Sequence, residues 1–268
     1  MKKRLQNITN KIPAVISLCC IMVLWHCLCA FEVVPSYMLP SPWDVVCAFV
    51  EDFTLIMHHA KVTLLEAMYG LLIGIALAFL IATVMDRYHM LYQAGYPLMV
   101  ITQTIPTIAI APLLVLWMGF GMAPKITLVV LTTFFPIAVG LLEGYRSVDK
   151  DYMNLMRSMG ASKIQIFTMV KIPTALPHFF SGLKISVSYA VVGAVISEWL
   201  GGFEGLGVYM TRVKKAYAFD RMFAVILLIV IISLLLMGFV NILRDVSMPW
   251  MNKGETIYEN KENRNNGM

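Results

Sequence analysis

The sequence predicts an all-α, polytopic membrane protein with six transmembrane helices. Hydrophobic residues make up 59% of its 268 residues, and charged residues only 14%. A water-soluble domain of this length needs far more charge to cover its surface. Six apolar runs are also long enough to cross a bilayer, since about 20 residues suffice for a helix. These runs are Pro13–Phe31, Thr63–Met85, Tyr96–Met118, Pro124–Leu142, Phe179–Leu200 and Met222–Leu243.

The first run follows a basic segment, residues 1–12, which we expect to form a cytoplasmic N-terminus. The run is too long for the core of a secretion signal, and no A-x-A cleavage site follows it. We therefore interpret it as the first membrane span. All five cysteines lie in or near this run without a C-x-x-C pair, so they indicate neither a metal nor a redox site.

Lysines and arginines are unevenly distributed between the runs. Fourteen fall in the segments on the N-terminal side of the membrane, and six fall on the other side. Because cytoplasmic loops are enriched in basic residues, both termini and the loop 143–178 are predicted to be cytoplasmic. Residues 13–250 then form one transmembrane domain, and the polar segment 251–268 is a disordered cytoplasmic tail.

The outer loop between the first two runs contains a predicted helix. Ser41 can cap this helix, with Pro42 at its first position and Asp44 completing a capping box. Apolar residues that include Trp43 and Phe49 place the helix at the membrane interface.

The cytoplasmic loop between the fourth and fifth runs predicts two short helices. The segment 149–159 carries one apolar stripe, and Gly160 suits the left-handed position that ends a helix. Ser162 and Gln165 form a capping box for a second helix, which Pro173 and Pro177 are expected to stop. An amphipathic loop lying on the lipid headgroups is an alternative interpretation of the same pattern.

This loop resembles the EAA loop of permeases from binding-protein-dependent ABC importers. That loop has the pattern E-A-A, three residues, Gly, about nine residues and I-x-L-P. Gly160 matches the glycine and residues 172–177, IPTALP, match the closing element, whereas Asn154, Leu155 and Met156 replace E-A-A. The resemblance extends over about residues 39–250, through QTIPTIAIAPLLVLWMGFG, FFPIAVGLLEGYRSVD and EWLGGFEGLGVYMTRVKKAYAFDR.

The resemblance implies a homodimer of permeases in a bacterial inner membrane, with two cytoplasmic ATPase subunits and an external substrate-binding protein. The chain itself contains no G-x-x-x-x-G-K-[ST] phosphate loop, so ATP is expected on the partner subunits and no cofactor on this chain. Nor do we expect an enzyme or a nucleic-acid partner. The residues expected to couple to the ATPase are Asn154, Leu155, Met156, Met159, Gly160, Ala161, Ser162, Ile164 and Phe167.

Polar residues in the third and fifth runs predict the translocation path. Pro106 and Pro112 are expected to bend the third run, and irregular backbone is tolerated in a membrane where it lines a cavity. The candidates for the path are Gln103, Thr104, Thr107, Tyr189 and Glu198. The threonines can instead bond back to their own helix.

The outer segment 201–221 carries four glycines and several basic residues, against the usual charge bias. The glycines suit a re-entrant turn before a helix. Arg212, Lys214 and Lys215 on that helix could dock acidic groups of the binding protein. A solvated interfacial helix is the alternative.

The sequence also contains two packing motifs, and it leaves the substrate and the class of transporter open. Gly70 to Gly74 and Gly140 to Gly144 each form G-x-x-x-G, which permits close helix packing. The wider sequence looks similar to permeases for thiamine pyrimidine precursors, with taurine or sulfonate, nitrate and riboflavin permeases as alternatives. An ion-driven secondary transporter is a further alternative, although the charged residues Glu66, Lys184 and Glu198 lie toward the ends of their spans.

Overall fold

The computed structural model describes residues 2–35 and 37–250, and within these ranges it contains helices and no strand. The predicted tail therefore lies outside the described residues. The helices are α1 (Lys2–Ala30), α2 (Pro42–Glu51), α3 (Phe53–Arg87), α4 (His89–Thr104), α5 (Thr107–Met118), α6 (Met122–Arg146), α7 (Lys150–Ser158), α8 (Lys163–Ile166), the π-helix η1 (Phe167–Lys171), α9 (Ile172–Gly201), α10 (Leu206–Lys215) and α11 (Phe219–Ser247).

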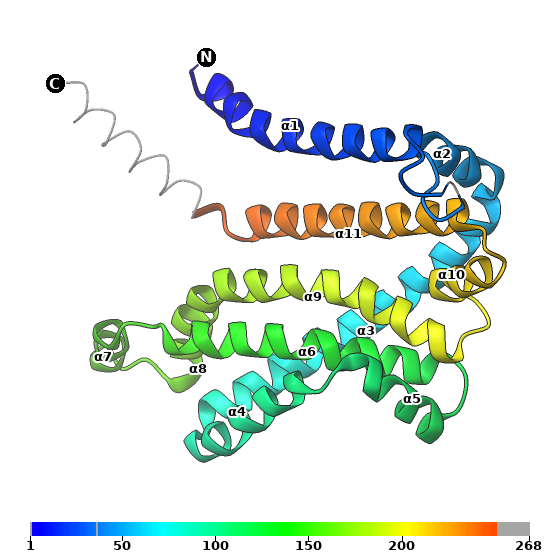
Figure 1. Cartoon of the computed structure of the whole chain (residues 1–268). Helices are drawn as coiled ribbons and strands as arrows, with labels where there is room; N and C mark the ends of the chain where they lie inside the picture. The colour runs from blue at the N-terminus through cyan, green and yellow to red at the C-terminus, as the bar shows by residue number, and fades with distance from the viewer. Residues whose placement is uncertain (1, 36, 251–268) are drawn as a thin grey trace.

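The long helices confirm an all-α, polytopic membrane fold. In the described chain, α3, α6, α9 with its preceding turns, and α11 are long and apolar enough to cross a membrane, and α4 with α5 would make a fifth span. The described apolar part of α1, Val15–Ala30, is shorter. Successive long elements run back and forth, so that the start of α1, the end of α11 and the α7–α8 pair lie at one end (Figure 1). This path is compatible with six crossings.

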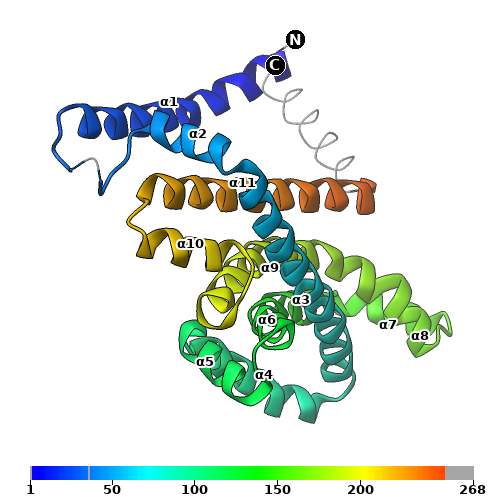
Figure 2. The ribbon, with the colours of Figure 1, turned by 90° about the vertical axis from the view of Figure 1, so that its right-hand side faces the viewer.

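Helix α6 lies at the centre of the fold, between α3 and α9. Helices α1 and α11 lie on one side of this core and α4 and α5 on the other, in both views (Figures 1 and 2). A Cβ atom on Gly140 would lie 2.6 Å from the carbonyl oxygen of His178 in α9, and one on Gly144 would lie 2.7 Å from Cβ of Ala175. Gly70 and Gly74 face α6 in the same way. Both G-x-x-x-G pairs therefore lie at close helix contacts.

The third predicted span, Tyr96–Met118, is not one bent helix but two helices at 98°. The break lies at Ile105 and Pro106, whose ψ angles of 121° and 123° are extended. Pro106 lacks the N–H that a helix needs, and it also disfavours the helical conformation of Ile105 before it. The two effects together break the helix at these residues. Pro112 lies inside α5 without breaking it.

The prediction that Pro173 and Pro177 stop the second cytoplasmic helix is wrong. The chain stays helical from α8 through η1 into α9. The Ile172 N–H bonds to the Phe167 carbonyl, five residues back, and Pro173 then occupies the first turn of α9, where its missing N–H costs little. Pro177 is accommodated inside α9.

The close α6–α9 contact gives a first testable prediction. Gly140→Ala should lower the free energy of unfolding by about 1–3 kcal/mol, because the added methyl meets a backbone carbonyl that cannot rotate away. Thermal unfolding of the detergent-purified protein would measure the change. Gly238→Ala in α11 is the matched control, since a Cβ there meets nothing within 4 Å. Equal stability of the two variants would contradict the close contact.

Candidate functional site

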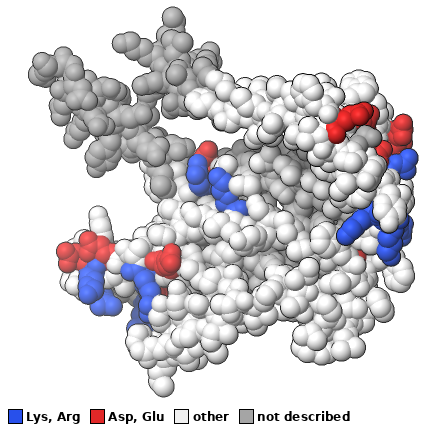
Figure 3. Space-filling model, viewed as in Figure 1, with Lys and Arg blue, Asp and Glu red and all other residues white. Residues whose placement is uncertain are grey.

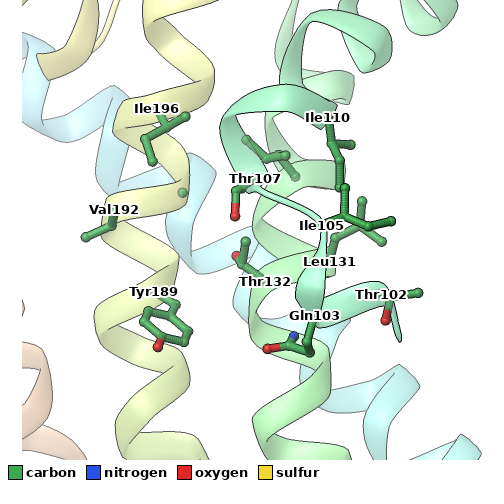
Figure 4. A pocket seen from close by; sticks show the side chains of 12 residues that line it. Thr102, Gln103, Ile105, Thr107, Ile110, Leu131, Thr132, Tyr189, Val192 and Ile196 are labelled. Carbon is green, nitrogen blue, oxygen red and sulfur yellow. The ribbon is translucent and has the colours of Figure 1, made fainter. Parts of the chain in front are cut away.

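A cavity of about 320 Å³ lies beside the break between α4 and α5. Gln103 and Thr107, on either side of the break, face the same space as Thr132 of α6 and Tyr189 of α9 (Figure 4). The remaining lining residues come from the same helices: Thr102, Ile105, Ile110, Leu128, Leu131, Val192, Gly193 and Ile196. Three of the five predicted path residues, Gln103, Thr107 and Tyr189, are thus brought together.

The cavity is lined by both apolar and polar side chains, and none of them is charged. None of its lining residues is Lys, Arg, Asp, Glu or His. Thr102 and Thr132 bond to carbonyls of their own helices, at 2.7 and 2.9 Å. Within the described chain the side chains of Gln103, Thr107 and Tyr189 make no hydrogen bond, and the first turn of α5 has no side-chain cap. These groups can therefore bond a solute that occupies the cavity.

Thr104 and Glu198 lie elsewhere. Thr104 is exposed and donates to the carbonyl of Ile101 at 2.8 Å, as the alternative interpretation of the threonines expected. Glu198 is buried, and its carboxylate accepts bonds from the Thr63 hydroxyl and the Gly207 N–H, both at 2.6 Å. Glu198 thus serves a contact between helices and is not open to this cavity.

The predicted cytoplasmic helix pair has the expected local geometry. Gly160 has φ of 78°, and the Ala161 and Gly160 N–H groups bond to the carbonyls of Met156 and Arg157, which together form a Schellman motif. The Ser162 capping box that starts α8 is present. Two caps therefore fix the angle between α7 and α8.

The helix pair carries exposed apolar side chains. Leu155, Met159 and Ile164 are each more than half exposed, and Asn154 is exposed as well. Met156 and Phe167 are partly buried, with the Phe167 ring 5.3 Å from that of Tyr145. The segment is therefore tied to α6 through Phe167, and the helix pair also carries apolar side chains that remain exposed in the described chain.

A salt bridge also ties this loop to α3. Nζ of Lys171 lies 2.7 and 2.8 Å from the two carboxylate oxygens of Asp86, and the pair is mostly buried. Between the end of α3 and the helix pair lies a groove of about 700 Å³. The loop is thus held against two spans and is not a free segment on the lipid surface.

At the opposite end of the molecule, α10 carries the basic residues predicted to dock a partner. Its apolar residues Leu206, Tyr209 and Val213 are buried against the protein, so α10 is packed on the spans rather than laid on lipid. Lys214 and Lys215 are exposed, whereas the Arg212 guanidinium donates to the Phe203 carbonyl at 2.8 Å. Charged side chains gather at the two ends of the molecule, and the wide band between them is mostly uncharged (Figure 3).

Helices α10 and α11 are also tied to the junction of α2 and α3 by Asp52. This carboxylate accepts a bond from the Tyr209 hydroxyl at 2.6 Å and pairs with Arg221 at 3.0 Å. Burial and the bond to Asp52 raise the pKa of Tyr209 above its usual value. Tyr209 thus stays a hydroxyl donor, which keeps α10 fixed to the start of α3.

Residues 70–253 match the model of the family described as the inner membrane component of binding-protein-dependent transport systems. The match covers the central spans, the cavity and the α7–α8 pair. The chain belongs to this family. It is a permease subunit of an ABC importer rather than an enzyme, and ATP hydrolysis takes place on a separate subunit.

Characterised relatives and solved structures agree with this assignment. The permease is 36% identical over 87% of its length to the formylaminopyrimidine transport permease protein ThiX of Halalkalibacterium halodurans, of which the match covers 93%. It is 27% identical over 88% of its length to the riboflavin transport system permease protein RibX of Chloroflexus aurantiacus, again covering 88% of that protein. In fold it is similar to the MetNI methionine ABC transporter, with TM-score 0.58, 20% identity and coverage of 71% and 93% of the two chains.

The permease uses two residues for its cavity that the sequence interpretation missed, Thr102 and Thr132. For Thr132 a signal was present, since it is one of two adjacent threonines that interrupt the fourth apolar run. The sequence also gave no indication of the partners of Glu198, because Thr63 lies 135 residues away.

Gly160 provides a second testable prediction. Gly160→Val should abolish association of the permease with its ATPase, because a β-branched residue strongly disfavours φ of 78° and the angle between α7 and α8 would be lost. Co-purification of the two subunits would measure this. A Cβ at this position meets no other atom within 4 Å, so Gly160→Asn, which tolerates the left-handed conformation, should retain association. Normal association of the valine variant would refute the role of the turn.

Proposed function

We propose that this permease imports a small, uncharged heteroaromatic solute of the thiamine pyrimidine precursor class. The cavity beside the α4–α5 break forms part of the path. The observation that carries the proposal is that three helices, α4, α5 and α9, direct Gln103, Thr107 and Tyr189 into one space with no charged side chain. An aminopyrimidine with a formamide group matches such a site, because it offers hydrogen-bond donors, acceptors and a flat ring for the tyrosine.

The other substrates match this cavity less well. Taurine and other sulfonates carry a full negative charge, as nitrate does, and an anion in a membrane cavity is stabilised by a cationic side chain. The lining contains no lysine or arginine. Riboflavin is uncharged, but its three fused rings and ribityl chain are much larger than a single pyrimidine ring. The name of the ThiX relative supports the smaller ring.

The two ends of the molecule contact different partners of the importer in this proposal. The end that carries α7 and α8 is the cytoplasmic one, and its exposed Leu155, Met159 and Ile164 dock into an ATPase subunit. Two copies of the permease form a homodimer with two ATPases. The opposite end faces an external binding protein, which delivers the solute. Both chain termini are then cytoplasmic, in agreement with the excess of basic residues on that side.

Uptake into proteoliposomes tests the substrate class. Vesicles with the permease, its ATPase and the external binding protein should take up radiolabelled formylaminopyrimidine when ATP is inside. Gln103→Leu should reduce the rate about tenfold, the effect expected from losing one or two hydrogen bonds to the solute. Thr104→Val is the control, because Thr104 is the next residue but lies outside the cavity lining.

Other results would contradict separate parts of the proposal. Uptake of taurine or nitrate but not the pyrimidine would refute the substrate class while leaving the importer intact. Equal effects of the two variants would show that the cavity is not on the path. Uptake driven by an ion gradient in the absence of ATP would refute ATP-driven import.

The external docking surface gives a further prediction. Reversing the charge of both exposed lysines, Lys214→Glu with Lys215→Glu, should weaken association with the binding protein several-fold, mainly through a slower association rate that recovers at high salt. Surface plasmon resonance on the reconstituted transporter would measure the rates. Lys61→Glu is the control, since Lys61 is exposed at the same end but lies on α3. Unchanged rates in the double variant would exclude docking through these lysines.

A further inference from the structure

The N-terminus of α10 lacks a cap from its own sequence. Gly205 occupies the N-cap position and has no side chain, and the first N–H groups of a helix have no acceptor within it. Residues 205–207 are buried, so water does not replace the missing acceptors. An uncapped helix start at this depth would be strongly disfavoured.

Three side chains from other helices satisfy these N–H groups one after another. The Gly205 N–H donates to Nδ1 of His59 at 3.0 Å, and the Leu206 N–H donates to Oγ1 of Thr63 at 2.8 Å. The Gly207 N–H donates to Oε2 of Glu198 at 2.6 Å. The cap of α10 is therefore assembled from α3 and α9.

Two of these side chains are also bonded to each other, and α6 reaches the same turn through Lys125. The Thr63 hydroxyl donates to the other carboxylate oxygen of Glu198 at 2.6 Å, which links α3 directly to α9. In α6, the Lys125 ammonium pairs with Glu66 at 2.7 Å and reaches the Glu204 carbonyl, just before α10, at 3.3 Å. Three spans thus hold the start of α10 through buried polar contacts.

The turn leaves no room for a side chain at Gly205 or Gly207. Gly205 has φ of 122°, and a Cβ there would overlap the Glu198 carboxylate. A side chain on Gly207 would lie 2.9 Å from Cβ of Glu198. The glycines predicted to form a re-entrant turn therefore also make room for the carboxylate that caps the helix.

We propose that His59, Thr63 and Glu198 are positioning residues that fix α10 as a rigid extension of α3 and α9. Lys214 and Lys215 lie on the exposed side of this same helix. A displacement of α10 on binding of an acidic external protein would therefore be transmitted directly to the spans, because buried hydrogen bonds rather than a flexible loop join them. This role rests on the docking function proposed above, whereas the anchoring itself does not.

Thr63 allows a sharp test, because two close substitutions separate shape from hydrogen bonding. Thr63→Val keeps the volume but loses both the acceptor for Leu206 and the donor to Glu198, whereas Thr63→Ser keeps both. In the complete transporter in nanodiscs, amides of residues 205–209 should exchange with deuterium about tenfold faster in the valine variant and at the wild-type rate in the serine variant. The affinity for the external binding protein should fall several-fold in the valine variant alone.

Each of the other possible outcomes would contradict one part of the proposal. Wild-type exchange in the valine variant, or equal acceleration in both variants, would overturn the anchoring. Faster exchange with unchanged affinity would overturn the positioning role. If the wild-type transporter binds no external protein, the docking function fails and the positioning role fails with it, while the exchange rates still report on the anchoring.

Discussion

Close packing of α6 between α3 and α9 is the constraint on which the other features depend. Spans in lipid gain little from the hydrophobic effect against one another, so their contact relies on surfaces that fit closely. Gly70 and Gly74 let α6 approach α3, and Gly140 and Gly144 let it approach α9. This bundle then supplies one wall of the cavity, the base of the α7–α8 pair and the three spans that hold α10.

Features that depend on residues within a few positions of one another could be predicted from the sequence. Apolar runs located the spans, and the capping boxes at Ser41 and Ser162 located two helix starts. The role of Gly160 at the end of a helix could be predicted because the left-handed conformation found there depends only on local backbone sterics. Gln103 and Thr107 were found for a related reason, since polar side chains beside a proline in a span indicate irregular backbone facing a cavity.

Features that depend on distant contacts could not be predicted. A glutamate in a span indicates water, a partner or substrate, but the sequence does not say which. Glu198 finds its partners in Thr63 and in the turn before α10, and only the folded chain brings these together. Proline was misjudged in the same way. Pro106 breaks its helix, whereas the chain stays helical through Pro173, because the π-helical turn before Pro173 removes the conflict.

The continuity of α8, η1 and α9 has a mechanical consequence for the permease. A helix transmits displacement along its axis, whereas a flexible loop would absorb it. Helix α8, the cavity residue Tyr189 and the anchor Glu198 all lie on this one continuous helical segment, in that order along the chain. The facing wall of the cavity, at the α4–α5 break, belongs to a different element. If an ATPase docks on α7 and α8 as proposed, their movement would shift Tyr189 relative to the break and change the shape of the cavity. Because Glu198 holds α10 at the far end of the same segment, that movement would also reach the surface proposed to dock the binding protein.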